Sequence, residues 1–136
     1  MSPGPRRTRA EPPPTPPLHE LESEVMEQLW AHGEASVREV MEALNKRARP
    51  KRAYTTYMTI MARLHKKGVL ERRREGKTDF YAPRLGRDEY MASRAQAQID
   101  ELVEEYGDVA LTHFAKQVAS LDPARRKALQ RLARKP

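Results

Sequence analysis

The clearest periodic pattern of apolar and polar positions lies in the middle of the chain. Four large apolar residues there follow the spacing i, i+3, i+4 and i+7, namely Tyr57, Ile60, Met61 and Leu64. This spacing places them on one side of an α-helix. Gly68 comes shortly afterwards, and glycine is favoured just past a helix end because it adopts positive φ readily. The pattern predicts a helix that buries the four side chains and stops before Gly68.

The opposite side of this helix is small and polar at first and basic towards its end. At about 100° per residue, it carries Thr55, Thr59, Ala62 and Lys66, with Thr56 and Arg63 at its flanks. A slim helix face of this kind suits close approach to the major groove of DNA. Periodicity alone does not separate it from an ordinary solvated helix surface. The charge of the neighbouring segments decides between the two interpretations.

Two short strands are predicted after Gly68. Residues 69–74 and 77–83 flank a turn at Glu75 and Gly76, which is the pattern of a β-hairpin. The hairpin is rich in arginine. A thin helix followed by a basic hairpin suits duplex DNA, with the helix in the major groove and the hairpin on the backbone.

Two more helices are predicted before this segment. The first covers residues 18–30, and its exposed positions are predicted to be acidic and to face away from DNA: Glu20, Glu22, Glu24 and Glu27. The second covers residues 37–46 and begins at a capping box formed by Ser36 and Glu39. The order helix, helix, helix, hairpin predicts a mainly α fold, a winged helix-turn-helix of three helices and a two-stranded wing within residues 18–84.

The charge distribution favours a polyanionic partner. The 136-residue chain has a formal net charge of +7. Its excess of basic residues is concentrated between Lys46 and Lys77, where only Glu71 and Glu75 oppose it. A basic patch on one unit is typical of nucleic-acid binding. The predicted DNA contacts are Arg52, Thr55, Thr56, Thr59, Arg63, Lys66, Arg72, Arg74 and Lys77.

Residues 85–136 are predicted to form a helical dimerisation region. The pattern indicates a helix from Asp88 to about Tyr106, a second from Asp108 and a third that begins at Pro123. So few large apolar residues cannot build an independent core. A second copy of the chain is the simplest partner, and packing back onto the winged domain is the alternative. The predicted two-fold interface contains Leu102, Val103, Phe114, Leu129 and Leu132.

The proline-rich N-terminus, the lack of cysteine, the histidine spacing and the short apolar runs restrict the classes of function that the sequence predicts. Residues 1–17 are rich in proline, which predicts a disordered or polyproline-like arm. For its arginines, Arg6, Arg7 and Arg9, a solubilising role is favoured over the alternative of contact with DNA phosphates. The chain has no cysteine, and its histidines lack any metal-ligand spacing. We therefore expect no metal, no cofactor and no enzymatic activity. No apolar run approaches the roughly 20 residues that cross a bilayer, so a cytoplasmic protein without membrane insertion is expected.

Several short motifs resemble one known family. They are Leu21-Glu22, Val25-Met26, Leu29-Trp30, Ala53-Tyr54-Thr55-Thr56, Met58-Thr59, Arg63-Leu64, Lys67-Gly68 and Tyr81-x-Pro83. Over residues 18–134 the chain resembles the penicillinase-repressor family, the BlaI, MecI and CopY type. The resemblance implies a homodimeric winged-helix repressor that binds a palindromic operator.

The chain departs from the family pattern at two points. Tyr57 stands where relatives commonly have a smaller β-branched residue, so the core or the tilt of the central helix is expected to differ. The copper-responsive branch has cysteine pairs that this chain lacks, which argues against that form of metal sensing. In antibiotic-responsive relatives a membrane sensor-protease triggers cleavage of the repressor, but no bond in this sequence is identified as the target.

Two functions from different classes remain possible at this point. The first is a DNA-binding repressor, and the second is a winged-helix module whose basic surface binds an acidic protein. The threonine-rich face favours DNA, because short hydroxyl side chains allow close approach to the groove and reach phosphates or base edges.

Overall fold

The computed structural model of the chain describes residues 18–136, so the predicted N-terminal arm, residues 1–17, lies outside the described residues. The chain divides into two compact units, and the division falls between Ala95 and Gln96.

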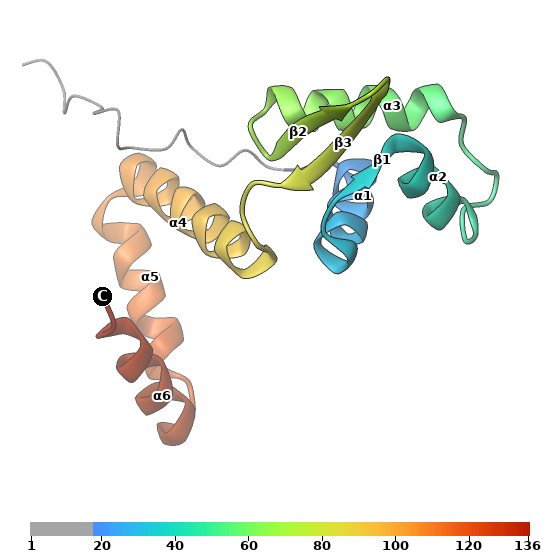
Figure 1. The fold of residues 1–136 in the computed structure, drawn as a ribbon. Helices are drawn as coiled ribbons and strands as arrows, with labels where there is room; N and C mark the ends of the chain where they lie inside the picture. The colour runs from blue at the N-terminus through green and yellow to red at the C-terminus, as the bar shows by residue number, and fades with distance from the viewer. Residues whose placement is uncertain (1–17) are drawn as a thin grey trace, which may run out of the picture. The chain divides into compact units, whose positions relative to one another are not determined.

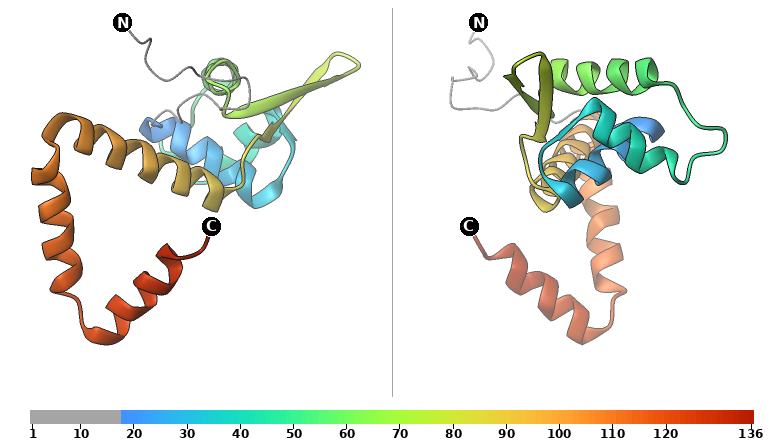
Figure 2. Two further views of the ribbon diagram at one scale, coloured as in Figure 1. Left: turned by 90° about the vertical axis from the view of Figure 1, so that its left-hand side faces the viewer. Right: turned by 45° about the vertical axis from the view of Figure 1, so that its right-hand side comes forward.

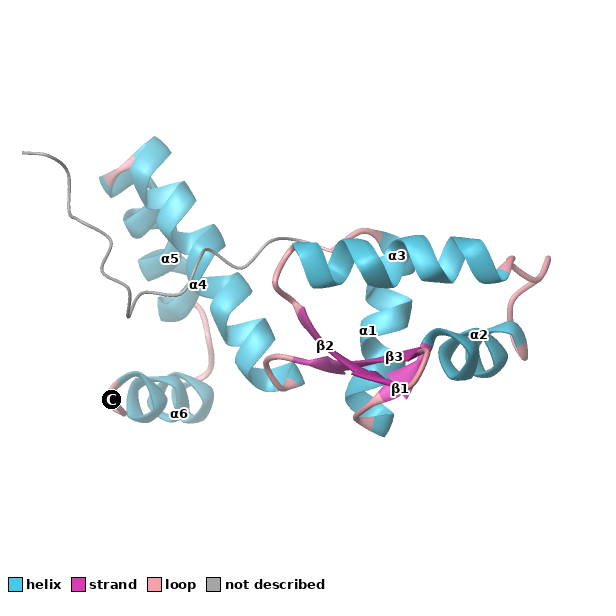
Figure 3. Cartoon of the chain, turned by 45° about the horizontal axis from the view of Figure 1, so that its top comes forward, coloured by secondary structure: helices cyan, strands magenta, loops and turns pink. Residues whose placement is uncertain are grey.

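The first unit has the predicted order of three helices and a hairpin (Figure 1). Its elements are α1 (Glu20–His32), β1 (Ala35–Ser36), α2 (Val37–Asn45), α3 (Tyr54–Lys66), β2 (Leu70–Glu75) and β3 (Thr78–Pro83). The mainly α winged-helix prediction is therefore confirmed. Figure 3 shows α3 lying along one side of this unit, with α1 and the strands beneath it.

The wing differs from the prediction in two details. It belongs to a three-stranded antiparallel sheet of order β1-β3-β2, in which Ala35 pairs with Tyr81. A two-residue strand has no periodicity, so sequence patterns could not reveal β1. Glu75 pairs with Thr78, which moves the turn by one residue to Gly76 and Lys77. Gly76 adopts a φ of 63°, the positive value that such a turn requires.

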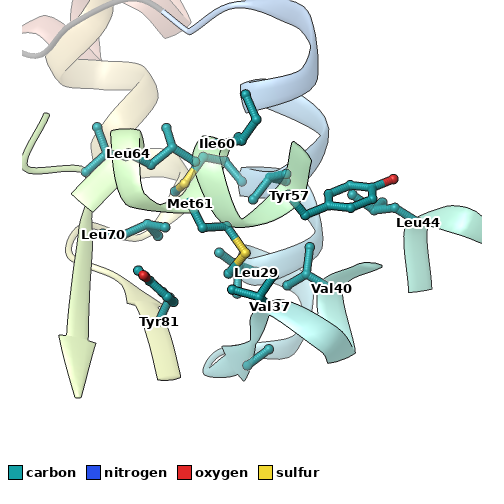
Figure 4. Close-up of a cluster of buried hydrophobic side chains, with 14 of the residues drawn as sticks. Leu29, Val37, Val40, Leu44, Tyr57, Ile60, Met61, Leu64, Leu70 and Tyr81 are labelled. Carbon is teal, nitrogen blue, oxygen red and sulfur yellow. The ribbon is translucent and has the colours of Figure 1, made fainter. Parts of the chain in front are cut away.

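The core of the first unit lies beneath α3 (Figure 4). All four predicted residues of α3 are buried, namely Tyr57, Ile60, Met61 and Leu64. They pack in one cluster with Val25, Met26 and Leu29 of α1, Val40 and Leu44 of α2, and Leu70 and Tyr81 of the sheet. Gly68 follows α3 with a φ of 82°, as predicted. The buried side of α3 thereby leaves its opposite side at the surface.

One acidic residue of α1 contradicts the predicted exposed face. Glu22 is fully buried, and both of its carboxylate oxygens accept hydrogen bonds from Lys67. The prediction was wrong at this position because a lysine 45 positions later in the chain supplies the compensating charge. The capping box of Ser36 and Glu39 at the start of α2 is confirmed by both of its hydrogen bonds.

The first turns of α4 (Arg87–Tyr106) belong to the first unit. The Trp30 indole N–H donates to the Leu85 carbonyl at 2.9 Å, and the rings of Trp30 and Tyr90 lie 5.4 Å apart. Tyr90 is buried. The compact unit therefore extends beyond residue 84, the boundary predicted from the sequence. The helix also begins one residue before the predicted Asp88, which lies inside its first turn.

The second unit contains the end of α4, α5 (Asp108–Ala119) and α6 (Pro123–Ala133). The chain turns sharply between these helices (Figure 2). Gly107 has a φ of 60° at the first turn, and the Asp122 carboxylate caps α6 by accepting from the Arg125 N–H at 3.0 Å. None of the side chains from residue 91 to 136 is buried in the single chain. The expectation that these helices lack an independent core agrees with this exposure.

Candidate nucleic-acid interface

The outer face of α3 forms the centre of the candidate interface. Thr55, Thr59, Arg63 and Lys66 are exposed, and Thr56 is half-buried. Thr55 and Thr59 lie one helical turn apart, so both hydroxyls lie on the same face of the helix. The basic residues follow in the last turns of the helix. The surface is therefore narrow and neutral at its start and positively charged at its end.

Alternation along β2 separates the arginines of the wing. Side chains two residues apart in a strand point to the same face, so Arg72 and Arg74 share the sheet face of buried Leu70. That face packs beneath α3 (Figure 4). Both arginines are exposed, which places their charges on the side of the sheet that α3 also occupies. The β2–β3 hairpin extends beyond the helices of the first unit, with Lys77 in its turn (Figure 2).

Arg73 lies on the other face of β2 and is held there by protein groups. Its guanidinium donates to both carboxylate oxygens of Glu34, at 2.7 and 3.1 Å, and also to Glu75. It lies 4.9 Å from the centre of the Phe80 ring. The hydrogen bonds that Arg73 donates to Glu34 and then to Glu75 raise the pKa of its guanidinium. Arg73 was absent from the predicted contacts, and its position offers no reason to add it.

Two predicted contacts are engaged within the chain. The half-buried Arg52 lies 3.5 Å from the Glu24 carboxylate of α1, and its pKa is raised by the Tyr57 hydroxyl and by Glu24. Its backbone exchanges two hydrogen bonds with the Asn45 amide. Arg74 lies 3.7 Å from Asp79 across the wing. The structure therefore brings Arg52 to α1, whereas Arg74 stays exposed beside its partner.

One basic residue that the sequence interpretation missed lies beside α3. The Arg38 guanidinium of α2 is exposed and lies 5.6 Å from the centre of the Tyr54 ring. Both residues line a surface hollow of about 360 Å³ that Met58 and Lys77 also border. The hollow thus joins the start of α2, the first half of α3 and the tip of the wing. Helical spacing marks Arg38 as exposed, but no local pattern shows that α2 begins beside the wing.

The arrangement offers hydroxyl groups and fixed positive charges on one surface rather than a reactive centre. Within residues 18–136 no group of three histidine or acidic side chains is placed to hold a metal ion. No helix in that part of the chain is long and apolar enough to cross a membrane. Hydroxyls, lysines and arginines on a protruding helix and hairpin are the groups that contact DNA phosphates and base edges.

Comparison with protein families and known sequences finds a repressor family and relatives named as regulators of transcription. A family model described as "Penicillinase repressor" matches residues 18–135. The "Transcriptional regulator BlaI" of Mycobacterium tuberculosis is 40% identical over 121 residues, which cover 85% of this chain and 84% of that protein. The "Penicillinase repressor" of Bacillus licheniformis is 31% identical over 84 residues, 60% of this chain and 62% of that protein.

Solved structures also resemble part of the chain. A solution structure of the DNA-binding domain of the repressor BlaI is 32% identical, with a TM-score of 0.49, over 56% of this chain and 90% of that one. The monomeric form of Bacillus licheniformis BlaI, solved with the blaP half-operator, is also 32% identical, with a TM-score of 0.47 and the same coverage.

Proposed function

This chain belongs to the penicillinase repressor family, and we propose that it is a transcriptional repressor that binds a palindromic DNA operator as a homodimer. One observation carries the proposal. The exposed threonines of α3 lie opposite the buried side of that helix, and the exposed Arg72 and Arg74 lie on the sheet face that carries buried Leu70 and Tyr81 beneath α3. In this arrangement α3 enters the major groove while the wing follows the backbone.

Each group on this surface has a distinct role in the proposed complex. Thr55 and Thr59 lie in the middle of the face and contact base edges, and Thr56 supports them at the flank. Positive charges neutralise phosphates, which supplies most of the affinity without sequence preference. The proposed phosphate contacts are Arg63, Lys66, Arg72, Arg74 and Lys77, together with Arg38. Arg52 contributes by positioning, since it is bound to Glu24.

The second unit supports the proposal of a homodimer. Leu102, Phe114, Leu129 and Leu132 are exposed in the single chain and Val103 is partly exposed. Apolar faces of this extent are normally covered by a partner. A second copy would cover them and would bring a second α3 to the next half-site, about one helical turn or a multiple of it away. Binding the second half-site becomes intramolecular, which raises affinity by about 10² to 10⁴.

The alternative of a module that binds an acidic protein is not favoured. The family and the matched relatives are regulators of transcription rather than enzymes or adaptor proteins. The short exposed hydroxyls of α3 also allow close approach to base edges in the major groove. A cytoplasmic location is proposed, because it is consistent with the DNA-binding regulators among the relatives.

The test is selection and titration with the full-length chain. Duplexes enriched from a random-sequence pool should contain a palindrome, and sedimentation should give a dimer. The logarithm of the binding constant should fall linearly with the logarithm of salt concentration, by about 0.9 for each phosphate neutralised. Thr59→Ala should reduce preference for the selected duplex by roughly 1 kcal/mol and leave the fold intact. Salt-independent binding, or failure to enrich any sequence, would refute the proposed function.

A further inference from the structure

Two large apolar side chains of α3 are exposed, whereas the other large apolar residues of that helix are buried. Among the described residues that precede α4, Tyr54 and Met58 are the only large hydrophobic residues exposed, at 41% and 44%. They lie one turn apart on α3, at the edge of the face that carries Thr55 and Thr59. An exposed apolar group within a basic, hydroxyl-rich surface suggests an apolar partner at that point.

Tyr54 and Met58 differ in what surrounds them. The Tyr54 ring is covered on one side by the Arg38 guanidinium. Both side chains border the hollow between α2, α3 and the wing, which Lys77 also lines. The thioether of methionine is flexible and polarizable, so it adapts to small apolar groups of varied position. Met58 is therefore the apolar group on this surface that is best suited to contact a ligand.

The chemistry of the major groove restricts what that ligand can be. Among the groups that the four bases present in the major groove, nitrogen and oxygen donors and acceptors dominate, and the C5-methyl of thymine is the apolar one. Neighbouring positive charges, such as Lys77 and Arg38, favour a DNA backbone close to Met58. A helix inserted through its threonine face would bring the Met58 side chain to the wall of the same groove.

We propose that Met58 is a specificity-determining residue that contacts a thymine C5-methyl group in each half-site. The inference rests on the proposed function, because it requires α3 in the major groove. The contact removes one methyl group and part of the Met58 side chain from water. Burial of one methyl corresponds to about fourfold in affinity. Thr55 and Thr59 act on polar base edges, so Met58 adds discrimination between thymine and cytosine that hydroxyl groups supply poorly.

The experiment removes the methyl group from the DNA rather than from the protein. The probe is the duplex that the full-length chain enriches from a random pool, with each thymine replaced in turn by deoxyuridine. At one thymine position, replacement in a single half-site should weaken binding about fourfold, and replacement in both half-sites should weaken it about 16-fold. Met58→Ala should bind the thymine and deoxyuridine duplexes equally. Met58→Leu, which keeps an apolar side chain, should retain sensitivity to the methyl group.

Controls separate this inference from its premise. Thr55→Ala should weaken binding yet keep the effect of deoxyuridine, because Thr55 is proposed to contact a polar base edge rather than the methyl group. If no duplex is enriched, the proposed function fails. If a duplex is enriched but tolerates deoxyuridine everywhere, or if Met58→Ala keeps the methyl effect, only the role of Met58 is overturned. A Met58→Gln chain that folds but changes its sedimentation, with the methyl effect intact, would assign this patch to a protein partner instead.

Discussion

The Lys67 ammonium donates hydrogen bonds to both carboxylate oxygens of Glu22, each 2.9 Å long, and so joins the end of α3 to the first turn of α1. The His19 backbone N–H donates to the same carboxylate at 2.9 Å. Burial alone would raise the pKa of Glu22, but these hydrogen bonds and the charge of Lys67 lower it below its usual value. The ion pair holds the basic end of the proposed recognition helix against α1.

Loss of Lys67 should destabilise the first unit strongly. Lys67→Met leaves the Glu22 carboxylate buried without its countercharge, which costs about 3 kcal/mol of unfolding free energy. The cost lies at the low end of the range for buried pairs because 25% of the Lys67 side chain is exposed. Urea unfolding at neutral pH measures the loss. Lys66→Met, at the exposed neighbouring position, is the matched control and should change stability little; equal losses for the two variants would contradict the role of the pair.

The lowered pKa of Glu22 also predicts how stability depends on pH. Because the folded state holds the carboxylate ionised more strongly than the unfolded state does, the pair stabilises the protein above the unfolded pKa, about 4.3. This contribution is lost as pH falls through the lower folded pKa. The stability difference between the natural chain and Glu22→Gln should therefore be constant near pH 7 and shrink below about pH 4. A difference that grows on acidification would contradict this assignment.

The two faces of β2 predict opposite outcomes for adjacent arginines. Arg72→Gln should remove one phosphate contact and reduce the salt slope of DNA binding by about 0.9. Arg73→Gln should leave that slope unchanged, because Arg73 is bound to Glu34 and Glu75 on the other face. Titrating the selected duplex at several salt concentrations distinguishes the two. Equal reductions in slope would mean that the wing contacts DNA through its opposite face or edge.

The central helix was predictable from sequence because its buried and exposed residues repeat at the helical period. Tyr57 and Leu64 are buried and Thr55 and Thr59 exposed, as that period requires. Contacts between distant segments were not predictable in this way. The sequence around Glu22 does not show that Lys67 pairs with it. The sequence around Arg52 likewise does not show that Glu24 pairs with it. The pairing of Ala35 with Tyr81 likewise depends on the completed fold.

The hydroxyl of Tyr57, a residue whose effect the sequence did not reveal, helps to hold the loop between α2 and α3. Its hydroxyl donates to Asn45 Oδ1 at 2.8 Å, and the same amide exchanges hydrogen bonds with the backbone of Arg52. Tyr57→Phe keeps the ring in the core but removes the bond, so unfolding free energy should fall by about 1 kcal/mol. Hydrogen exchange in residues 46–53 should become faster. Tyr54→Phe, at an exposed ring, is the control; an unchanged exchange rate in Tyr57→Phe would show that Asn45 holds the loop without it.

Truncation should separate the stability of the first unit from assembly. A chain that ends at Ala95 keeps Tyr90 in its buried position beside Trp30. A chain that ends at Leu85 loses that ring and exposes Trp30, which should lower the unfolding free energy by about 3 kcal/mol, as for the loss of a large buried aromatic side chain. Thermal unfolding compares the two.

Both truncated chains should be monomers, because each lacks the exposed apolar faces of α5 and α6. Each should bind the selected palindrome about 10² to 10⁴ times more weakly than the full-length dimer, since the second half-site no longer binds as an intramolecular event. Sedimentation and duplex titration measure the two effects separately. A monomeric full-length chain would remove the basis for the dimer. A chain ending at Ala95 that binds the palindrome as tightly as the full-length protein would assign the second unit another role, because affinity would then come from the first unit alone.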